Sequence, residues 1–170
     1  MYPVMWDWLT RVHGVTSVLD VGCGDGSAVQ TFRDLGMHAI GVDGVPGPGV
    51  DIVHDFTEGP MNVRVSGLRE FDLVWSCEFV EHVNEEHIPN FLETFKSAPL
   101  VMLTHAIPGQ NGHHHVNCRT EDYWIGVMAG IGYREDWVLS RSARAQVMLY
   151  DTSEGYYAKT GLAFRRRDAG

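Results

Sequence analysis

Short apolar runs alternate with amphipathic segments through most of the chain. Each run is six to eight residues long and is bounded by glycine, proline or polar residues. This is the pattern of strands that are buried on both faces of a sheet. Five strands are therefore expected, at residues 17–22, 38–43, 51–56, 71–78 and 99–106.

The segments between these runs predict helices. Val4, Trp8 and Val12 recur at helical spacing, so a short amphipathic helix is expected over residues 2–12. Further helices are expected over residues 27–35, 80–96 and 120–131, with Gly36 as a C-cap, Pro89 at a start or a kink, and Thr120 as an N-cap.

The remaining segments are less regular. Residues 44–51 are too rich in glycine and proline for a helix, and residues 57–69 are ambiguous, with a short helix as one option. Near the end, strand-like stretches at residues 136–150 and 156–166 flank the turn residues 151–155 and predict a hairpin. Alternating strands and helices predict a doubly wound, mostly parallel α/β sheet of seven strands, with this antiparallel hairpin at one edge.

The composition is that of one folded domain. The 170 residues are 44% hydrophobic and 21% charged, with a formal net charge of −9, so a single globular domain over residues 1–170 is expected. The acidic balance argues against a mainly electrostatic grip on nucleic acid. The three cysteines match no metal or disulfide framework, and neither a signal-peptide pattern nor a membrane-spanning run is found. A cytoplasmic protein without membrane contact is expected.

A glycine-rich loop joins the first expected strand to the next helix. Gly22, Gly24 and Gly26 allow a tight turn and a close approach of backbone N–H groups to a ligand. Asp20 precedes the loop, and Asp43 ends the second strand 23 positions later, where a carboxylate can accept hydrogen bonds from both hydroxyls of a ribose. The spacing is Gly-x-Gly-x-Gly and not the Gly-x-Gly-x-x-Gly of dinucleotide sites. An acid beside the loop also suits a cationic amino-acid group better than a pyrophosphate.

Five stretches resemble, in order, the motifs of class I S-adenosylmethionine-dependent methyltransferases. The likeness covers residues 15–135 and implies a Rossmann-like fold, S-adenosyl-L-methionine as cofactor, and methyltransferase activity. The stretches are VLDVGCGDG at 18–26, GVDG at 41–44, HDF at 54–56, FDLVWSCEFVEHV at 71–83 and HHHVNCRTEDYWIGVMAGIGY at 113–133.

The resemblance also implies roles for individual residues. Asp20, Gly22 and Gly24 would hold the methionine end of the cofactor, and the backbone of Cys77 would accept a hydrogen bond from its ammonium group. Asp43 would bind the ribose hydroxyls. The adenine would lie against Asp55 and Phe56. The cofactor-binding set implied in this way is Asp20, Gly22, Cys23, Gly24, Asp43, Gly44, Asp55, Phe56, Cys77 and Glu78.

A Glu-x-x-Glu-His motif follows the fourth expected strand directly. On a helical turn Glu78, Glu81 and His82 would face the same way, and two carboxylates with an imidazole can bind a divalent metal. The motif resembles that of the metal-dependent small-RNA 3′-terminal ribose methyltransferases, whose later histidine lies five residues before a helix-starting threonine, as His115 lies before Thr120. A ubiquinone-pathway O-methyltransferase group has a similar motif. The resemblance implies a Mg or Mn site at Glu78, Glu81, His82 and His115; alternatively, these residues cap a helix and line the cofactor pocket.

A histidine can also act without a metal, as the general base for an acceptor hydroxyl, because its pKa lies near neutrality. His82, His113 and His115 are the candidates. The favoured function is O-methylation of a small molecule, a sugar or a ribose, with a small-molecule or glycan acceptor as the partner. Two alternatives stay open: a metal-dependent RNA ribose 2′-O-methyltransferase, and a cofactor-binding partner subunit without catalysis.

The chain is short for this class. Sixteen residues precede the first expected strand, and GVPGPGVD at 44–51 replaces a helix that usually follows the second strand. Acceptor specificity in this family usually comes from such parts. The hypothesis is therefore an open acceptor site. Such a site suits a large or polymer-attached acceptor, or it is completed by a second subunit, for example in a homodimer.

Overall fold

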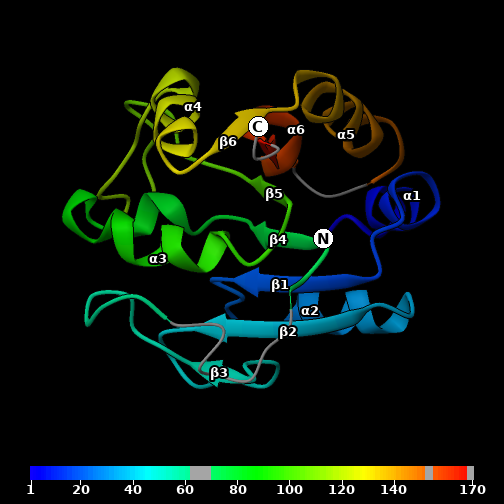
Figure 1. Ribbon diagram of the computed structural model, residues 1–170, viewed down its shortest axis with the longest axis horizontal. Coiled ribbons are helices and arrows are strands. Elements are labelled where there is room, and N and C mark those ends of the chain that lie inside the picture. Colours follow the sequence, from blue (N-terminus) through cyan, green and yellow to red (C-terminus); the bar gives the residue numbers. More distant parts are fainter. Residues whose placement is uncertain (62–69, 152–154, 168–170) are drawn as a thin grey trace.

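The structure is a computed structural model that describes residues 1–61, 70–151 and 155–167. Within these residues, seven strands form one sheet in the order β3-β2-β1-β4-β5-β7-β6 (Figure 1). The strands are β1 Ser17–Val21, β2 His38–Asp43, β3 Ile52–Val53, β4 Leu73–Ser76, β5 Leu100–Leu103, β6 Tyr133–Glu135 and β7 Leu162–Arg166.

The first five strands are parallel, and β7 pairs antiparallel with both β5 and β6. The predicted fold class, a mostly parallel α/β sheet with an antiparallel edge, is confirmed. Because β1 lies between β2 and β4, the chain reverses its direction of winding beside β1. The carboxyl ends of β1, β2 and β4 meet at this switch point, which is where ligands bind in open α/β sheets.

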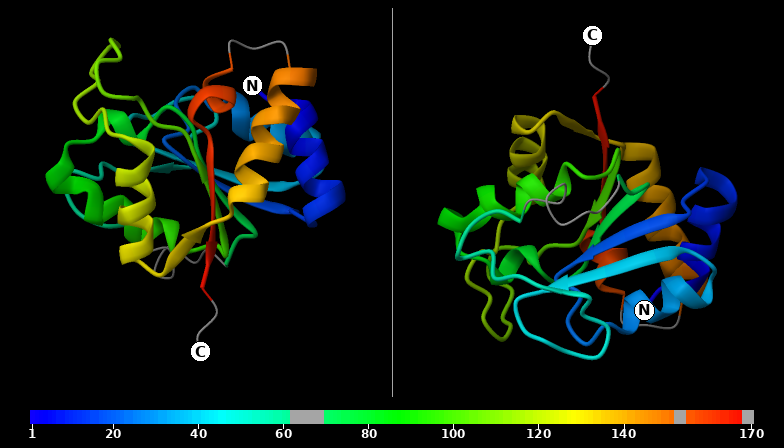
Figure 2. Two further views of the ribbon diagram at one scale, coloured as in Figure 1. Left: turned by 90° about the horizontal axis from the view of Figure 1, so that it is seen from above. Right: turned by 60° about the horizontal axis from the view of Figure 1, so that its bottom comes forward.

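Helices cover both faces of the sheet (Figures 1 and 2). Helices α1, α2, α5 and α6 pack on one face, and α3 and α4 pack on the other. Two short 3-10 turns, η1 and η2, follow β4. The bounds are α1 Pro3–His13, α2 Ser27–Asp34, η1 Val80–His82, η2 Glu85–His87, α3 Ile88–Phe95, α4 Glu121–Gly130, α5 Trp137–Tyr150 and α6 Tyr156–Thr160.

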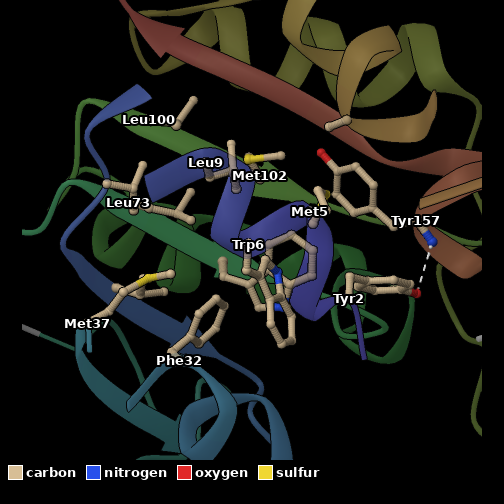
Figure 3. Packing of buried hydrophobic residues seen from close by; sticks show 14 of the residues in the cluster. Tyr2, Met5, Trp6, Leu9, Phe32, Met37, Leu73, Leu100, Met102 and Tyr157 are labelled. Carbon is tan, nitrogen blue, oxygen red and sulfur yellow. Dashed lines mark hydrogen bonds between the residues drawn. The ribbon is translucent and has the colours of Figure 1, made fainter. Parts of the chain in front are cut away.

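Alternating side chains on the strands feed the two cores. Leu73 and Trp75 of β4 point to the face of α1, while Val74 between them joins the core under α3. On the α1 face, the Trp6 ring lies with its centroid 4.2 Å from that of Phe32 (Figure 3). Its centroid lies 5.5 Å from that of Trp75. This aromatic cluster fixes α1 and α2 against the strands that carry the glycine loop.

The prediction for the end of the chain is wrong in one respect. Residues 137–150 form helix α5 and not a strand, because Leu139, Ala143 and Val147 recur every four residues and are all buried. The Asp136 side chain caps this helix by accepting a hydrogen bond from the N–H of Leu139. The antiparallel edge is therefore not a hairpin: β6 lies before α5, and β7 follows α6. Of the expected turn, residues 152–154 lie outside the described residues.

Smaller differences concern the ends and faces of elements. Residues 80–96 are not one helix, since η1 and η2 precede α3 and Pro89 lies in the first turn of α3, where its missing N–H costs nothing. Helix α1 buries Met5, Trp6 and Leu9, while Val4 and Val12 are 41% and 61% exposed. Residues 57–61 are not helical, and 62–69 lie outside the described residues.

The other expected elements are confirmed with shorter bounds for some strands. Residues 51–56 contribute only Ile52–Val53 to the sheet. The expected N-cap Thr120 is confirmed, because its side chain accepts a hydrogen bond from the N–H of Tyr123. No helix in the described part of the chain is both long and apolar enough to cross a bilayer.

Candidate active site

A cavity of about 360 Å³ opens at the carboxyl ends of β1, β2 and β4. It contains eight of the predicted site residues and five others. The lining residues are Gly22, Gly24, Asp43, Gly44, His54, Asp55, Phe56, Thr57, Glu78, Phe79, His82, Val83 and Asn84. Segments from four separate parts of the sequence thus meet in one cleft.

The glycine loop has the backbone conformation that its sequence predicts. The N–H groups of Gly22 and Cys23 both donate to the carbonyl of Val42 on the neighbouring strand. Gly26 has a φ of 75°, and a Cβ at this position would lie 2.4 Å from the Cα of Gly49. The glycine-rich segment after β2 therefore packs directly on the loop, which is why neither side can carry a side chain here.

Asp43 is held rigidly at the end of β2. Its Oδ2 accepts a hydrogen bond of 2.9 Å from the N–H of Gly24, and its Oδ1 accepts one of 3.0 Å from the N–H of Val45. The carboxylate is thereby fixed between the glycine loop and the cavity. Each of its oxygens has a further lone pair that can accept from a ligand hydroxyl.

The adenine-binding residues that the resemblance implied also line the cavity. Phe56 is buried, and its ring centroid lies 5.8 Å from that of Phe79, so that the two rings form an apolar wall. The side chain of Asn90 donates a hydrogen bond of 2.6 Å to the carbonyl of Phe56. The N–H and hydroxyl of Thr57 hydrogen-bond the Asp55 carboxylate and lower its pKa. This wall and carboxylate suit a flat heterocycle with amino donors.

Three of the predicted cofactor residues do not line the cavity. Asp20 is 2% exposed, and its Oδ2 has no hydrogen-bond partner among the described residues. Burial, followed by the nearby Asp43 carboxylate, raises the pKa of Asp20 to about 8. Cys23 and Cys77 are also outside the lining, and burial raises the pKa of the Cys77 thiol to about 12. These thiols are therefore poor nucleophiles.

Glu81, His82 and His115 lie together at the edge of this cavity. One ligand atom of each lies within 4.8 Å of the others, and His82 also lines the cavity. Glu81 and His82 come from η1, and His115 comes from the loop after β5. That loop is tied down because the N–H groups of Val116 and Asn117 both donate to the carbonyl of Glu81.

The carboxyl group of Glu81 is fully buried, and neither of its oxygens has a hydrogen-bond partner among the described residues. Burial and the adjacent Glu78 carboxylate raise its pKa to about 8. Burial also lowers the pKa of His82, whose Nδ1 lies 3.2 Å from the carbonyl oxygen of His114. A buried acid without partners next to two imidazoles matches the donor types of a divalent-metal site.

The expectation that Glu78, Glu81 and His82 share a helical turn is wrong. Glu78 lies before η1 with a φ of 54°, and Thr104 fixes it by accepting from its N–H and donating to its Oε1. Glu78 is therefore beside the three-residue group and not part of it. His113 is exposed, lies with its ring centroid 4.7 Å from that of His114, and is not a member of this group.

Phe79 is a cavity residue that the sequence analysis missed. A Cβ on Gly22 would lie 2.3 Å from the Phe79 Cδ2, so the absence of a side chain at Gly22 makes room for this ring. His54, Thr57, Val83 and Asn84 were missed as well. A bulky aromatic residue just after the fourth strand was the one available signal for Phe79.

Comparison with known proteins identifies the family. A family model described as a methyltransferase domain matches residues 7–145. The chain belongs to the class I S-adenosylmethionine-dependent methyltransferases. A curated relative, the ubiquinone biosynthesis O-methyltransferase of Aromatoleum aromaticum (strain DSM 19018 / LMG 30748 / EbN1), is 31% identical over 93 residues. That match covers 48% of this chain and 40% of the relative, so the chain spans less than half of the relative's length.

Solved methyltransferases share the fold of this chain. The sugar N-methyltransferase KedS8 from Streptoalloteichus sp ATCC 53650 has a TM-score of 0.65 at 13% identity, with 99% of this chain and 89% of that chain covered. The 1,6-didemethyltoxoflavin-N1-methyltransferase of Burkholderia thailandensis, solved with S-adenosylhomocysteine, has a TM-score of 0.63 at 16% identity, covering 96% and 77%. The small RNA methyltransferase HEN1 has a TM-score of 0.61 at 16% identity, covering 98% of this chain but 25% of that one.

The described residues fit the cofactor of this family. The glycine loop offers a backbone without side chains, the cavity offers the Asp43 carboxylate and the Phe56 wall, and Asp20 is a buried acid without a partner. A ribose can hydrogen-bond to such a carboxylate, an adenine can lie against such a wall, and a cationic methionine end suits such an acid. When bound, S-adenosylmethionine supplies an electrophilic methyl group.

Proposed function

We propose that this methyltransferase transfers a methyl group from S-adenosylmethionine to a hydroxyl oxygen. The observation that carries the proposal is that His82 both lines the cavity and lies with Glu81 and His115 at its edge. A hydroxyl acceptor needs its proton removed as the new O–C bond forms, and imidazole is suited to this near neutral pH.

In the proposed reaction the chain itself removes a proton and aligns the acceptor. In the transfer, the acceptor oxygen bonds to the methyl carbon, the carbon–sulfur bond breaks, and the hydroxyl proton goes to a base. We assign the base to His82 or His115, because burial lowers the pKa of His82 and favours its neutral, proton-accepting form. The main work of the remaining residues is to align the acceptor with the methyl group.

A second candidate keeps the same site but adds a divalent metal. The buried and unpartnered Glu81 carboxylate favours it, because such an oxygen pair is costly unless a cation or proton accompanies it. Glu81, His82 and His115 would hold Mg²⁺ or Mn²⁺, with Glu78 alongside, and the cation would acidify a bound hydroxyl. On this variant a terminal RNA ribose becomes a candidate acceptor, in line with the fold shared with HEN1.

For the acceptor we favour a small molecule or a glycan. The curated relative is named for ubiquinone biosynthesis, and two neighbours act on a sugar and on a small heterocycle by their descriptions. The net charge of −9 disfavours a nucleic acid. We also propose that the chain is one domain, since its described strands form one sheet, and that it is cytoplasmic, since its three cysteines are free thiols.

Turnover with isotopically labelled S-adenosylmethionine tests the proposal. Catechols, sugars and RNA with a free 3′ end would be incubated with the protein after chelation, and then with added Mg²⁺ or Mn²⁺. Methyl transfer to a hydroxyl without metal supports the base mechanism, and transfer that needs Mg²⁺ or Mn²⁺ supports the metal variant. Binding of S-adenosylhomocysteine with no turnover on any acceptor would instead indicate a non-catalytic partner subunit.

Substitutions separate the roles within the site. His82→Asn and His115→Asn should each lower turnover while S-adenosylhomocysteine affinity stays within a few-fold of wild type. His113→Asn is the matched control, because this histidine lies in the same loop but outside the cluster. If His82→Asn and His115→Asn are as active as wild type and His113→Asn, the assigned base and metal roles are both rejected.

A further inference from the structure

Helices α1 and α5 lie side by side on one face of the sheet (Figure 2). They run antiparallel, since the N–H of Val4 near the start of α1 donates to the side chain of Asp151, the residue that follows α5. Their inner faces contribute Met5, Leu9 and Ala143, among others, to one core. The two helices therefore form a rigid pair whose outer faces point away from the sheet.

The outer face of this pair is unusually apolar. In α5 these side chains gather at the two ends of the helix, residues 137–138 at its start and residues 148–150 at its end. Because the helices are antiparallel, Val12 of α1 lies toward the first group and Val4 toward the second. Met148 and Leu149, near the end of α5, are 73% and 70% exposed. The exposed apolar side chains of the pair are Val4, Val12, Trp137, Val138, Met148, Leu149 and Tyr150.

The polar residues of helices α1 and α5 are of the types found in protein–protein interfaces. Of the 22 aspartates and glutamates in the chain, only Asp7 lies in these two helices, and it is paired with Arg11. Arg141 lies over the ring of Trp137, with its Cζ 4.9 Å from the ring centroid. Protein interfaces are rich in aromatic residues, methionine and arginine and poor in lysine, glutamate and aspartate. Neither helix contains lysine or glutamate.

We propose that a second copy of this chain docks on the outer face of α1 and α5. Two molecules with a net charge of −9 repel each other over most of their surface. The α1–α5 face is where two copies can approach, because these helices add no unpaired acid to the contact: Asp7 is paired with Arg11 and Arg144 with Glu121, and Arg141 lies over Trp137. Two antiparallel helix pairs that meet across a two-fold axis form a four-helix contact, which is a common isologous arrangement.

The size of the face predicts a dimer that dissociates on dilution. Helix α1 has 11 residues and α5 has 14, so at 1.5 Å per residue they are about 16 and 21 Å long. Side by side, with a width of about 10 Å each, they present on the order of 400 Å². This is about half of the roughly 800 Å² that each partner buries in an interface of standard size.

Sedimentation equilibrium over a range of protein concentrations tests the proposal. Wild type should shift from 19.0 kDa toward twice that mass as concentration rises. The double variant Val138→Glu/Leu149→Glu should stay monomeric, because it would place four carboxylates in the contact. Val53→Glu is the control: it exposes one new carboxylate per chain on β3, at the far end of the sheet, and should dimerise like wild type.

Calorimetry with S-adenosylhomocysteine shows whether the variants are folded and keeps this test separate from the proposed function. None of the substituted residues lines the cavity, so both variants should bind with wild-type affinity. A wild-type chain that is monomeric at every concentration overturns the proposal and leaves the face to a different chain. A dimer that persists in the double variant overturns it as well, because the contact would then lie elsewhere.

Discussion

At the scale of the residue, Asp43 connects the glycine loop to the cavity. It accepts hydrogen bonds from the N–H groups of Gly24 and Val45 and still faces the space where a ribose would lie. It is also the residue for which the sequence carried the clearest signal, because a strand end next to a glycine loop is a local feature. A substitution here therefore tests the cofactor assignment most directly.

Asp43→Ala should weaken S-adenosylhomocysteine binding by about 1–3 kcal/mol, because charge-assisted hydrogen bonds to the ribose are lost. Isothermal titration calorimetry measures the change. Asp34→Ala, which removes an exposed acid at the end of α2, is the control and should leave affinity unchanged. Equal affinities for wild type and Asp43→Ala would show that the ribose lies elsewhere.

Gly22 and Phe79 offer a second test at this scale. Gly22→Ala should destabilise the fold both through its φ of 77° and through the 2.3 Å approach of a Cβ to the Phe79 ring. Gly24→Ala is the control, since its φ of 55° imposes a similar strain but no atom lies within 4 Å of its Cβ. Urea unfolding should show a loss of about 1 kcal/mol for Gly24→Ala and of roughly 1–3 kcal/mol more for Gly22→Ala.

Removal of the Phe79 ring should restore the part of the stability that Gly22→Ala loses through the steric clash. In the double variant Gly22→Ala/Phe79→Ala, the ring that meets the new Cβ is gone, so the two substitutions should couple favourably relative to the sum of the single effects. If the two effects simply add, the contact between Gly22 and Phe79 does not limit the substitution.

At the scale of the element, the loop after β5 decides where His115 lies. The ring of His115 packs on Gly112, where a Cβ would lie 2.2 Å from its Nε2. Gly112→Ala should therefore displace His115 and lower turnover or Mn²⁺ affinity without removing a proposed ligand. Gly126→Ala in α4 is the control, because its backbone is helical and no atom lies within 4 Å of its Cβ. Binding of Mn²⁺ followed by electron paramagnetic resonance, together with turnover, would reveal the difference.

Helix α5 shows why parts of the fold escape prediction from the sequence. Its buried residues Leu139, Ala143 and Val147 have helical spacing, but the exposed apolar residues at both ends of the helix conceal that period. Exposed apolar residues break the usual relation between pattern and burial. The same residues that made 136–150 resemble a strand now form the proposed docking face.

Some residues of the candidate site can be predicted from the sequence and others cannot. Glycine positions and strand-end acids depend on local backbone geometry, so Gly22, Gly24 and Asp43 could be placed from the sequence. The contact of Gly22 with Phe79, and that of His82 with His115, join segments more than 30 residues apart. Such contacts follow from how the strands and loops pack and leave no regular spacing in the sequence.

At the scale of the whole molecule, the site stores unfavourable electrostatic energy. Asp20 and Glu81 are buried acids without partners among the described residues, and the pKa of each is raised to about 8 from ordinary values of 3.8 and 4.5. Functional sites commonly contain such groups, at the expense of fold stability. For this chain, the cost should appear as a pH dependence of unfolding.

The free energy of unfolding should depend on pH because the folded and unfolded states bind different numbers of protons. Between about pH 4 and about pH 8 the folded state holds more protons at Asp20 and Glu81 than the unfolded state does, so the free energy of unfolding falls as pH rises. Thermal unfolding across this range should show a falling Tm for wild type and a weaker fall for Asp20→Asn, which cannot ionise. If Asp20 holds the methionine end of the cofactor, as the family resemblance implies, saturating S-adenosylhomocysteine should also weaken the fall in wild type, because a nearby ammonium group favours the charged carboxylate. Parallel curves for wild type and Asp20→Asn would show that Asp20 is not the buried acid responsible.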